Sequence, residues 1–221
     1  ASALAALETD EIDLGVTLVE LGSNTTSVAV YHGSALRHSA TIPIGSASIT
    51  NDIAVMLQIS KKEAEKIKID YSSALSSMSS SQLNIKYHSI KELKDKAISE
   101  QEVSQYVEAR MQEILQMIIR EISRADIKDP LTYGIVMTGG GAELRNLSSL
   151  IEKILNAKVR KGKPNRIDGS EEIASDPQYT TVFGLLLWPL FSVDHVQFNL
   201  RNNGGLKNLI KKIRHTIEDM F

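Results

Sequence analysis

Cysteine is absent from this 221-residue chain, and proline and aromatic residues are scarce, with five prolines and 5% aromatics. The absence of cysteine excludes disulfide bonds and thiol chemistry and makes a reducing compartment the simpler expectation. No uninterrupted apolar run reaches the roughly 18 residues of a membrane-spanning helix, and we expect no signal peptide. The formal net charge of −2 is too small to indicate a nucleic-acid partner.

The remaining composition is that of a globular protein with room for a hydrophobic core, with 42% hydrophobic and 24% charged residues. The chain opens within an Ala/Leu helical pattern that has no capping residue, so we expect it to be a fragment. Its charge is uneven, because residues 201–221 carry five Lys or Arg against two acids while the rest is net acidic. The tail is therefore expected to have a function distinct from that of the body.

Two β-prone runs, Val16–Leu21 and Ser27–Tyr31, flank a small polar turn and predict a β-hairpin. Gly22 allows the backbone to approach a ligand closely, and clustered amides with the Thr25 and Thr26 hydroxyls suit an anion such as a phosphate. An ordinary hairpin with a polar turn is the alternative. The turn consists of Gly22, Ser23, Asn24, Thr25 and Thr26.

The order of predicted elements matches one half of an actin-like fold, if residues 48–130 are set aside as largely an insertion. Capping boxes are predicted at Ser60 with Glu63 and at Ser99 with Glu102. Residues 72–84 and 164–176 are expected to be loops. The predicted elements are a helix ending near Ala6, an acidic turn at 8–13, strands at 16–21, 27–31 and 35–44, helices at 49–57 and from 61, a short strand at 83–87, a helix from Ser99 to about Arg124, a strand at 133–138, a helix at 142–155, a strand near 158–160 and a helix from Pro177 that stops at Trp188-Pro189.

Gly139, Gly140 and Gly141 stand between an apolar strand and a predicted helix, where bare backbone lets a ligand lie against the turn. They do not form a dinucleotide-binding fingerprint, because Leu144 occupies the position of its last glycine. A tight strand-to-helix connection is the alternative, although it seldom needs three consecutive glycines.

Glu65 and Lys68 are three residues apart on a predicted helix and therefore share one face. Together they are able to hold a sugar hydroxyl and an adenine edge. A solvated ion pair is the alternative, and such pairs are common on helix surfaces.

The segment Gly204–Phe221 has the pattern of an amphipathic helix that lies in a membrane interface. A terminal helix packed on its own domain is the alternative, although the Asn-Asn-Gly-Gly break before it favours a tethered helix. Two acids near its end weaken the basic face, so binding is expected to depend on avidity in a polymer. The apolar arc consists of Leu206, Leu209, Ile210, Ile213, Ile217, Met220 and Phe221, and the basic face carries Lys207, Lys211, Lys212 and Arg214.

Taken together, these motifs resemble the C-terminal half of the bacterial cell-division protein family FtsA. The resemblance covers essentially the whole chain. It rests on the hairpin turn at 22–26, Arg37-His38, Ile42-Pro43-Ile44-Gly45, Ile49-Thr50-Asn51-Asp52-Ile53, Glu63-Ala64-Glu65-Lys66-Ile67-Lys68, Gly134 to Gly141, Gly184-Leu185-Leu186-Leu187 and the amphipathic tail.

The resemblance implies an α/β, actin-like (ribonuclease-H-like) half with an inserted small α/β subdomain and a C-terminal amphipathic helix. The implied parts are an inter-half helix at 1–14, a core at 15–47 and 131–187, a small subdomain at 48–130, a linker at 188–203 and the membrane helix at 204–221.

The resemblance also implies a function at the division septum. Such a protein binds ATP with Mg²⁺, polymerises on the cytoplasmic face of the inner membrane, contacts other division proteins and tethers the tail of FtsZ there. By motif match, Gly22–Thr26 is the second phosphate loop, Glu65 and Lys68 meet ribose and adenine, and Gly139, Gly140, Gly141 and Ala142 close over the adenosine. The small subdomain receives the FtsZ tail, with Arg110, Arg120 and Arg124 as candidate contacts on the long helix.

The phosphate loop departs from the family pattern Asp-x-Gly-Gly-Gly-Thr-Thr-Asp. This chain has Glu20 in place of the first acid, Ser23 and Asn24 in place of two glycines, and Ser27 in place of the last acid. Because the loop has fewer glycines, its backbone can approach a phosphate less closely. Because Ser27 replaces the last acid, the loop also lacks a carboxylate to bind metal-coordinated water. The loop is therefore expected to hold a phosphate but to hydrolyse ATP weakly, as befits a tether rather than an enzyme.

Two other functions are open to an actin-like chain. A sugar kinase or phosphatase of the same superfamily needs a carboxylate base, and Ser27 stands where an acid is often found. A pilus-assembly adaptor of the superfamily has no need of an amphipathic tail, so the tail favours the membrane tether.

Overall fold

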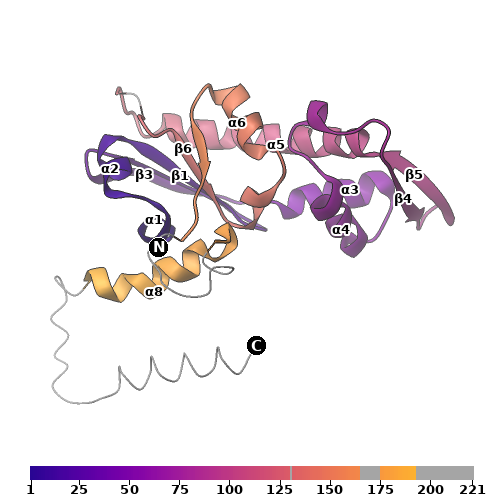
Figure 1. Ribbon diagram of the computed structural model, residues 1–221, viewed down its shortest axis with the longest axis horizontal. Helices are drawn as coiled ribbons and strands as arrows, with labels where there is room; N and C mark the ends of the chain where they lie inside the picture. The colour runs from indigo at the N-terminus through magenta and orange to yellow at the C-terminus, as the bar shows by residue number, and fades with distance from the viewer. Residues whose placement is uncertain (130, 165–174, 193–221) are drawn as a thin grey trace, which may run out of the picture. The chain divides into compact units, whose positions relative to one another are not determined.

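The computed structural model describes residues 1–129, 131–164 and 175–192 (Figure 1). It separates into one unit at 1–188 and a second at 189–221. The predicted amphipathic helix at 204–221 and the linker residues 193–203 lie outside the described residues. Among the described helices, none is long and apolar enough to cross a membrane.

The described elements run in the order predicted for an α/β chain. They are α1 (Ser2–Ala6), α2 (Thr9–Leu14), β1 (Val16–Leu21), β2 (Thr26–His32), β3 (Ala35–Ile42), α3 (Ala47–Leu57), α4 (Lys61–Tyr71), the 3-10 turn η1 (Ser76–Met78), β4 (Asn84–Ser89), β5 (Lys94–Ser99), α5 (Glu100–Ser123), β6 (Ile135–Thr138), η2 (Gly140–Glu143), α6 (Leu147–Leu155), β7 (Val159–Lys161), η3 (Pro177–Tyr179) and α8 (Thr180–Ser192).

A five-stranded mixed sheet in the order β3-β2-β1-β6-β7 forms the core. Strands β1, β2 and β3 make an antiparallel meander, and β6 and β7 are parallel to β1. Side chains alternate along β1, so Val19 and Leu21 belong to the larger core cluster, and Val16 and Leu18 pack with α1 on the opposite face. The meander and the parallel strands match the predicted half of an actin-like fold.

The segment between β3 and β6 contains α3, α4, the two-stranded sheet β4-β5 and the long helix α5 (Figure 1). Buried α5 residues such as Val107 and Ile114 share one core with the main sheet, because α5 packs against β2 and β3. The sequence predicted β4 but not β5, whose alternating Lys and Asp residues are mostly exposed.

Both serines predicted as caps accept a backbone amide, but of the two predicted capping boxes only that of Ser99 with Glu102 is complete. The Ser60 Oγ accepts the Glu63 amide at 3.2 Å and starts α4. The Ser99 Oγ accepts the Glu102 amide at 3.2 Å, and the Glu102 carboxylate accepts the Ser99 amide at 3.0 Å. This reciprocal pair satisfies two backbone donors at the start of α5.

The predicted acidic turn at 8–13 is wrong, because the segment forms helix α2. The Glu11 carboxylate accepts the Glu8 amide at 2.9 Å, which closes a capping box. The same carboxylate receives Arg160 Nε at 2.7 Å from strand β7. A residue 149 positions away along the chain therefore supports this helix, and a local sequence pattern contains no sign of it.

The predicted helix at 142–155 is also wrong at its start. The chain forms η2 after the glycines, and α6 begins only at Leu147, after Asn146 in a left-handed conformation. The Arg145 Nε donates to the Ser72 carbonyl at 3.0 Å, and Asn146 Nδ2 donates to Ser73 Oγ at 2.9 Å. These bonds to the end of α4 hold the segment out of a helix.

Helix α8 continues to Ser192 and does not stop at Trp188-Pro189 as predicted. Proline inside a helix removes one backbone hydrogen bond and bends the axis, but it does not always end the helix. Elsewhere, β3 ends at Ile42, two residues before its predicted end, since Pro43 has no amide to donate.

Candidate functional site

A cavity of about 330 Å³ lies between the β1–β2 turn, helices α3 and α4, and the glycine turn η2. It gathers residues from five separate parts of the sequence, the fifth being Gln178 of η3. Five residues predicted to bind a nucleotide are among those that line it, namely Ser23, Glu65, Lys68, Gly140 and Gly141.

The β1–β2 turn is tightly closed and leaves its tip open to solvent. The Gly22 amide donates to the Thr25 carbonyl at 3.0 Å. Ser23, Asn24 and Thr25 are exposed, and their amides have no hydrogen-bond partner among the described residues. Three free amides in succession are suited to an anion.

The start of α3 holds the turn in place. The Ser46 and Ala47 amides donate to the Gly22 and Ser23 carbonyls at 2.9 and 2.8 Å. A Cβ at Gly45 would lie 2.5 Å from the Ser23 carbonyl oxygen, so only glycine allows this approach. The backbone therefore fixes the turn next to the cavity.

The two threonines of the turn differ, although both hydroxyls were expected to meet a phosphate. Thr26 is fully buried, and its hydroxyl donates to the Ile44 carbonyl at 2.7 Å. Its proton is therefore not available to a phosphate, and that part of the expectation is wrong. Thr25 is exposed at the tip of the turn.

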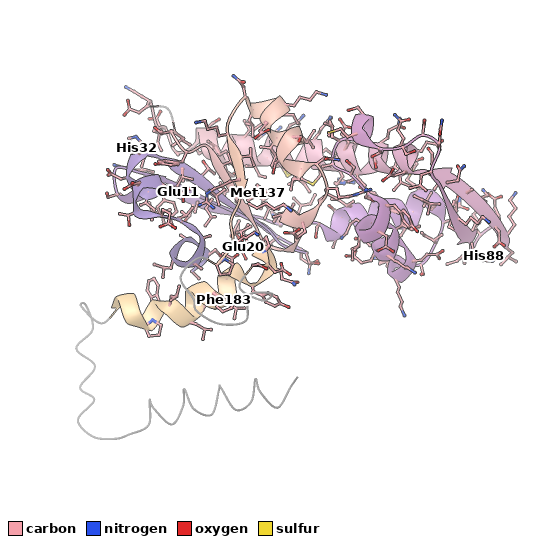
Figure 2. All side chains as sticks on the ribbon, viewed as in Figure 1. Glu11, Glu20, His32, His88, Met137 and Phe183 are labelled. Carbon is pink, nitrogen blue, oxygen red and sulfur yellow. The ribbon has the colours of Figure 1, made fainter. Side chains whose placement is uncertain are left out.

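Glu20, which stands in place of the first acid of the family pattern, faces α1 and α8 (Figure 2). Alternation along β1 puts it on the opposite face from its neighbour Leu21. Its carboxylate accepts the Ser2 hydroxyl at 2.7 Å and the Thr181 hydroxyl. Glu20 and its strand partner Ser27 line a second cavity of about 320 Å³ and not the first one. Both oxygens of Glu20 already accept hydrogen bonds within the protein.

Glu65 and Lys68 form an ion pair on α4, with Lys68 Nζ 2.8 Å from Glu65 Oε2. Thr50 of α3 donates its hydroxyl to the same Glu65 oxygen and accepts Lys68 Nζ at 3.0 Å. Partial burial raises the pKa of Glu65, but the hydrogen bonds from Lys68 and Thr50 outweigh burial and hold it below its usual value. Glu65 is therefore an ionised acceptor at neutral pH.

Close packing requires two of the three glycines after β6, Gly139 and Gly141, but not Gly140. Gly139 has φ +82°, and a Cβ there would lie 2.7 Å from the Leu21 carbonyl oxygen. A Cβ at Gly141 would lie 2.4 Å from Leu21 Cγ, whereas Gly140 has open space beside Gln178. Close packing against β1 therefore explains Gly139 and Gly141. Gly139 and the buried Ala142 do not line the cavity, contrary to the expected contact with adenosine.

Sequence patterns did not identify most of the remaining lining. Arg145 directly follows the glycine turn, and Gln178 belongs to the η3 turn that precedes α8. Only the tertiary fold brings Arg145 and Gln178 beside α4, so no local spacing marks them. The lining residues that the sequence did not single out are Leu21, Ser46, Ile49, Ile69, Ser72, Glu143, Leu144, Arg145 and Gln178.

The three arginines predicted to contact a partner do not form one surface. Arg110 donates Nε to Asp52 at 2.6 Å and Nη1 to Glu113 at 2.5 Å, in a groove of about 320 Å³ between α3 and α5. Arg124 pairs with Glu121, and Arg120 is exposed. Ten helical residues separate Arg110 from Arg120, which is about 15 Å along the axis.

Comparisons with known proteins agree with this architecture. The family model described as "Cell division protein FtsA" matches residues 17–184. The FtsA of Pseudomonas aeruginosa is 36% identical over 190 residues, which cover 86% of this chain and 46% of that protein. The FtsA of Escherichia coli K12 is 33% identical over 193 residues, which cover 84% and 46%. The chain thus spans about half the length of these relatives.

A solved actin-like structure shares the fold. The crystal structure of MreB 5 of Spiroplasma citri bound to AMPPNP superposes with a TM-score of 0.71 and 20% identity, over 90% of this chain and 60% of that one. At this identity the likeness concerns the fold alone.

Proposed function

Since the chain belongs to the FtsA family of cell-division proteins, we propose that the protein containing it tethers FtsZ to the cytoplasmic face of the bacterial inner membrane at the septum. ATP with Mg²⁺ acts in this proposal as a ligand that promotes actin-like self-assembly and contact with other division proteins. The chain covers 46% of the Pseudomonas aeruginosa relative, so this activity is proposed for the whole protein.

The observation that carries the nucleotide part of the proposal is the cavity itself. It places an ionised Glu65, the glycine backbone of η2 and the open tip of the β1–β2 turn around one space. In the proposed complex, Glu65 accepts a ribose hydroxyl and the free amides of the turn face the phosphates. The AMPPNP bound by MreB 5, a protein of the same fold, is consistent with this assignment.

We further propose that ATP hydrolysis is slow and that the protein is not primarily an enzyme. Glu20 is held by Ser2 and Thr181, and Ser27 carries no charge. Neither residue is therefore a free carboxylate that activates water or orients metal-bound water. A rate of ATP turnover comparable to that of a sugar kinase or phosphatase would overturn this part.

The membrane part of the proposal rests on the sequence of residues 204–221. Leu206, Ile210 and Ile217 lie on the apolar arc, with Lys207 and Lys211 on the polar face. Such a helix binds anionic lipid through apolar burial and electrostatic attraction.

The α3–α5 groove is the proposed site for the tail of FtsZ. Val55 and Met56 are 64% and 53% exposed at its rim, next to Arg110. An apolar and acidic tail segment suits this surface, with an acidic residue replacing Glu113, the more exposed of the two Arg110 partners.

Recruitment of FtsZ to vesicles tests the proposal. Vesicles containing anionic phosphatidylglycerol should co-sediment FtsZ only when the protein is present, and ATP should increase the amount. Deleting residues 204–221 should abolish sedimentation of both proteins. Arg110→Ala should abolish only the recruitment of FtsZ, while Arg120→Ala on the same helix is the matched control.

If the protein and FtsZ still sediment with the vesicles after residues 204–221 are deleted, the proposed membrane tether is contradicted. Loss of FtsZ with Arg120→Ala and not with Arg110→Ala would place the FtsZ site elsewhere on α5.

A further inference from the structure

Thr50 occupies a position that the sequence did not single out as functional. It lies on α3, is 7% exposed and faces Glu65 and Lys68 on the neighbouring helix α4. Its single hydroxyl contacts both members of the ion pair, since it donates to Glu65 Oε2 and accepts Lys68 Nζ at 3.0 Å.

The three donors of the Lys68 ammonium are all used within the protein. They reach Glu65 Oε2 at 2.8 Å, Thr50 Oγ1 at 3.0 Å and the Ser46 carbonyl at 3.4 Å. Because an ammonium has three N–H groups, none remains for a ligand. Lys68 is only 11% exposed, although it is among the residues that line the cavity.

Glu65 differs from Lys68 in this respect. Its Oε2 receives both Thr50 and Lys68, whereas Oε1 has no hydrogen-bond partner among the described residues. The side chain is 44% exposed and lines the cavity. The network thus fixes one carboxylate oxygen and leaves the other free to accept a hydrogen bond.

We propose that Thr50 is a positioning residue which, with Lys68, holds Glu65 so that Oε1 accepts one sugar hydroxyl of a bound ribonucleoside. The inference rests on the proposed binding of ATP and deepens it. Lys68 then acts on the sugar through Glu65 and does not contact the base. The site discriminates ribonucleotides from a deoxynucleotide that lacks the contacted hydroxyl.

Positioning by Thr50 should strengthen binding, because an unrestrained glutamate loses conformational freedom when it binds a ligand. Three rotatable bonds let Glu65 sample many positions, and ordering it costs affinity. Two hydrogen bonds to Oε2 order the side chain before the ligand arrives. Removing the Thr50 hydroxyl should therefore weaken ribonucleotide binding about tenfold, the usual scale of one hydrogen bond to a charged group.

The test measures binding of ATP, 2′-deoxy-ATP and 3′-deoxy-ATP by isothermal titration calorimetry, with the full-length protein that contains this chain. The unsubstituted protein should bind one deoxynucleotide about tenfold more weakly than ATP. Thr50→Val keeps the side-chain shape and should lose most of this preference, and Thr50→Ser should retain it. Thr17→Val, a buried isosteric change outside the cavity, is the matched control.

A double-mutant cycle separates positioning from a structural effect. Glu65→Gln should weaken ATP binding, and adding Thr50→Val should weaken it little further, since Thr50 acts through Glu65. Thr50→Ala provides a second variant without the hydroxyl if Thr50→Val does not fold.

An unchanged preference in Thr50→Val and Thr50→Ala, with ATP still bound, would overturn this inference and leave the proposed function standing. Additive losses in the cycle would also overturn it. If the unsubstituted protein binds none of the three nucleotides, the nucleotide part of the proposed function fails as well.

Discussion

Thr17 is fully buried in β1, between Val30 and Ile135 of the flanking strands, and its hydroxyl has no hydrogen-bond partner among the described residues. An unpaired buried hydroxyl costs free energy because it has lost its bonds to water. Thr17→Val keeps the β-branched shape and should raise the free energy of unfolding by about 1 kcal/mol. Urea denaturation measures this change.

Thr26→Val is the matched control on the neighbouring strand. It removes a hydroxyl that donates to the Ile44 carbonyl, so it should lower the free energy of unfolding by about 1 kcal/mol. Equal effects of the two substitutions would show that the Thr17 hydroxyl is hydrogen-bonded in solution.

The hairpin turn also shows why residue type alone does not define a contact. Thr25 and Thr26 are adjacent and chemically identical, yet one is exposed and the other buried against Ile44. Thr26 is the first residue of β2 and is buried, whereas Thr25 belongs to the turn before the strand.

At the scale of elements, Arg145 joins the glycine turn to helices α4 and α5. Its Nε donates to the Ser72 carbonyl at 3.0 Å, and Nη2 contacts the buried Glu100 carboxylate at 2.5 Å. Arg145→Lys retains the charge but loses the planar fork that makes both contacts. Because Arg145 is half exposed, the loss should be about 1–2 kcal/mol of unfolding free energy.

Hydrogen exchange supplements urea denaturation for this variant. The Ala74 amide donates to the Arg145 carbonyl at 2.8 Å and should exchange faster in Arg145→Lys. Arg120→Lys on the exposed face of α5 should change stability by less than about 0.5 kcal/mol. Identical stability and exchange in both variants would contradict a joining role for Arg145.

At the scale of the whole molecule, buried carboxylates make stability depend on pH. The Ser80 amide donates to Glu100 at 2.8 Å and, with Arg145, lowers the pKa of that carboxyl against burial. Burial raises the pKa of Glu108, but hydrogen bonds from Ser76 outweigh it and lower the pKa. Groups with a lowered pKa in the folded state stabilise it when they are ionised.

The unfolding free energy should therefore be nearly constant from pH 7 to pH 5. It should fall as the pH drops below the ordinary glutamate value of 4.5 and through the lower folded values. Urea denaturation across this range measures the effect, and Glu100→Gln with Glu108→Gln should flatten it. A protein that keeps its full stability at pH 3 would contradict the prediction.

The sequence by itself determined the elements whose stabilising residues are neighbours in the chain. Ser99 with Glu102 fixed the start of α5, and the β-prone runs around Gly22 fixed the hairpin. Apolar periodicity along α5 and the order of strands and helices determined the actin-like core, because burial of one face repeats with the period of the element.

Only the tertiary structure decided features that join distant residues. The contact of Arg160 with Glu11 supports α2, and Arg145 and Asn146 delay the start of α6 until Leu147. Thr50 gains its place beside Glu65 only when α3 packs on α4. Such contacts depend on how helices and strands pack in three dimensions, and the spacing of residues along the chain does not indicate that packing.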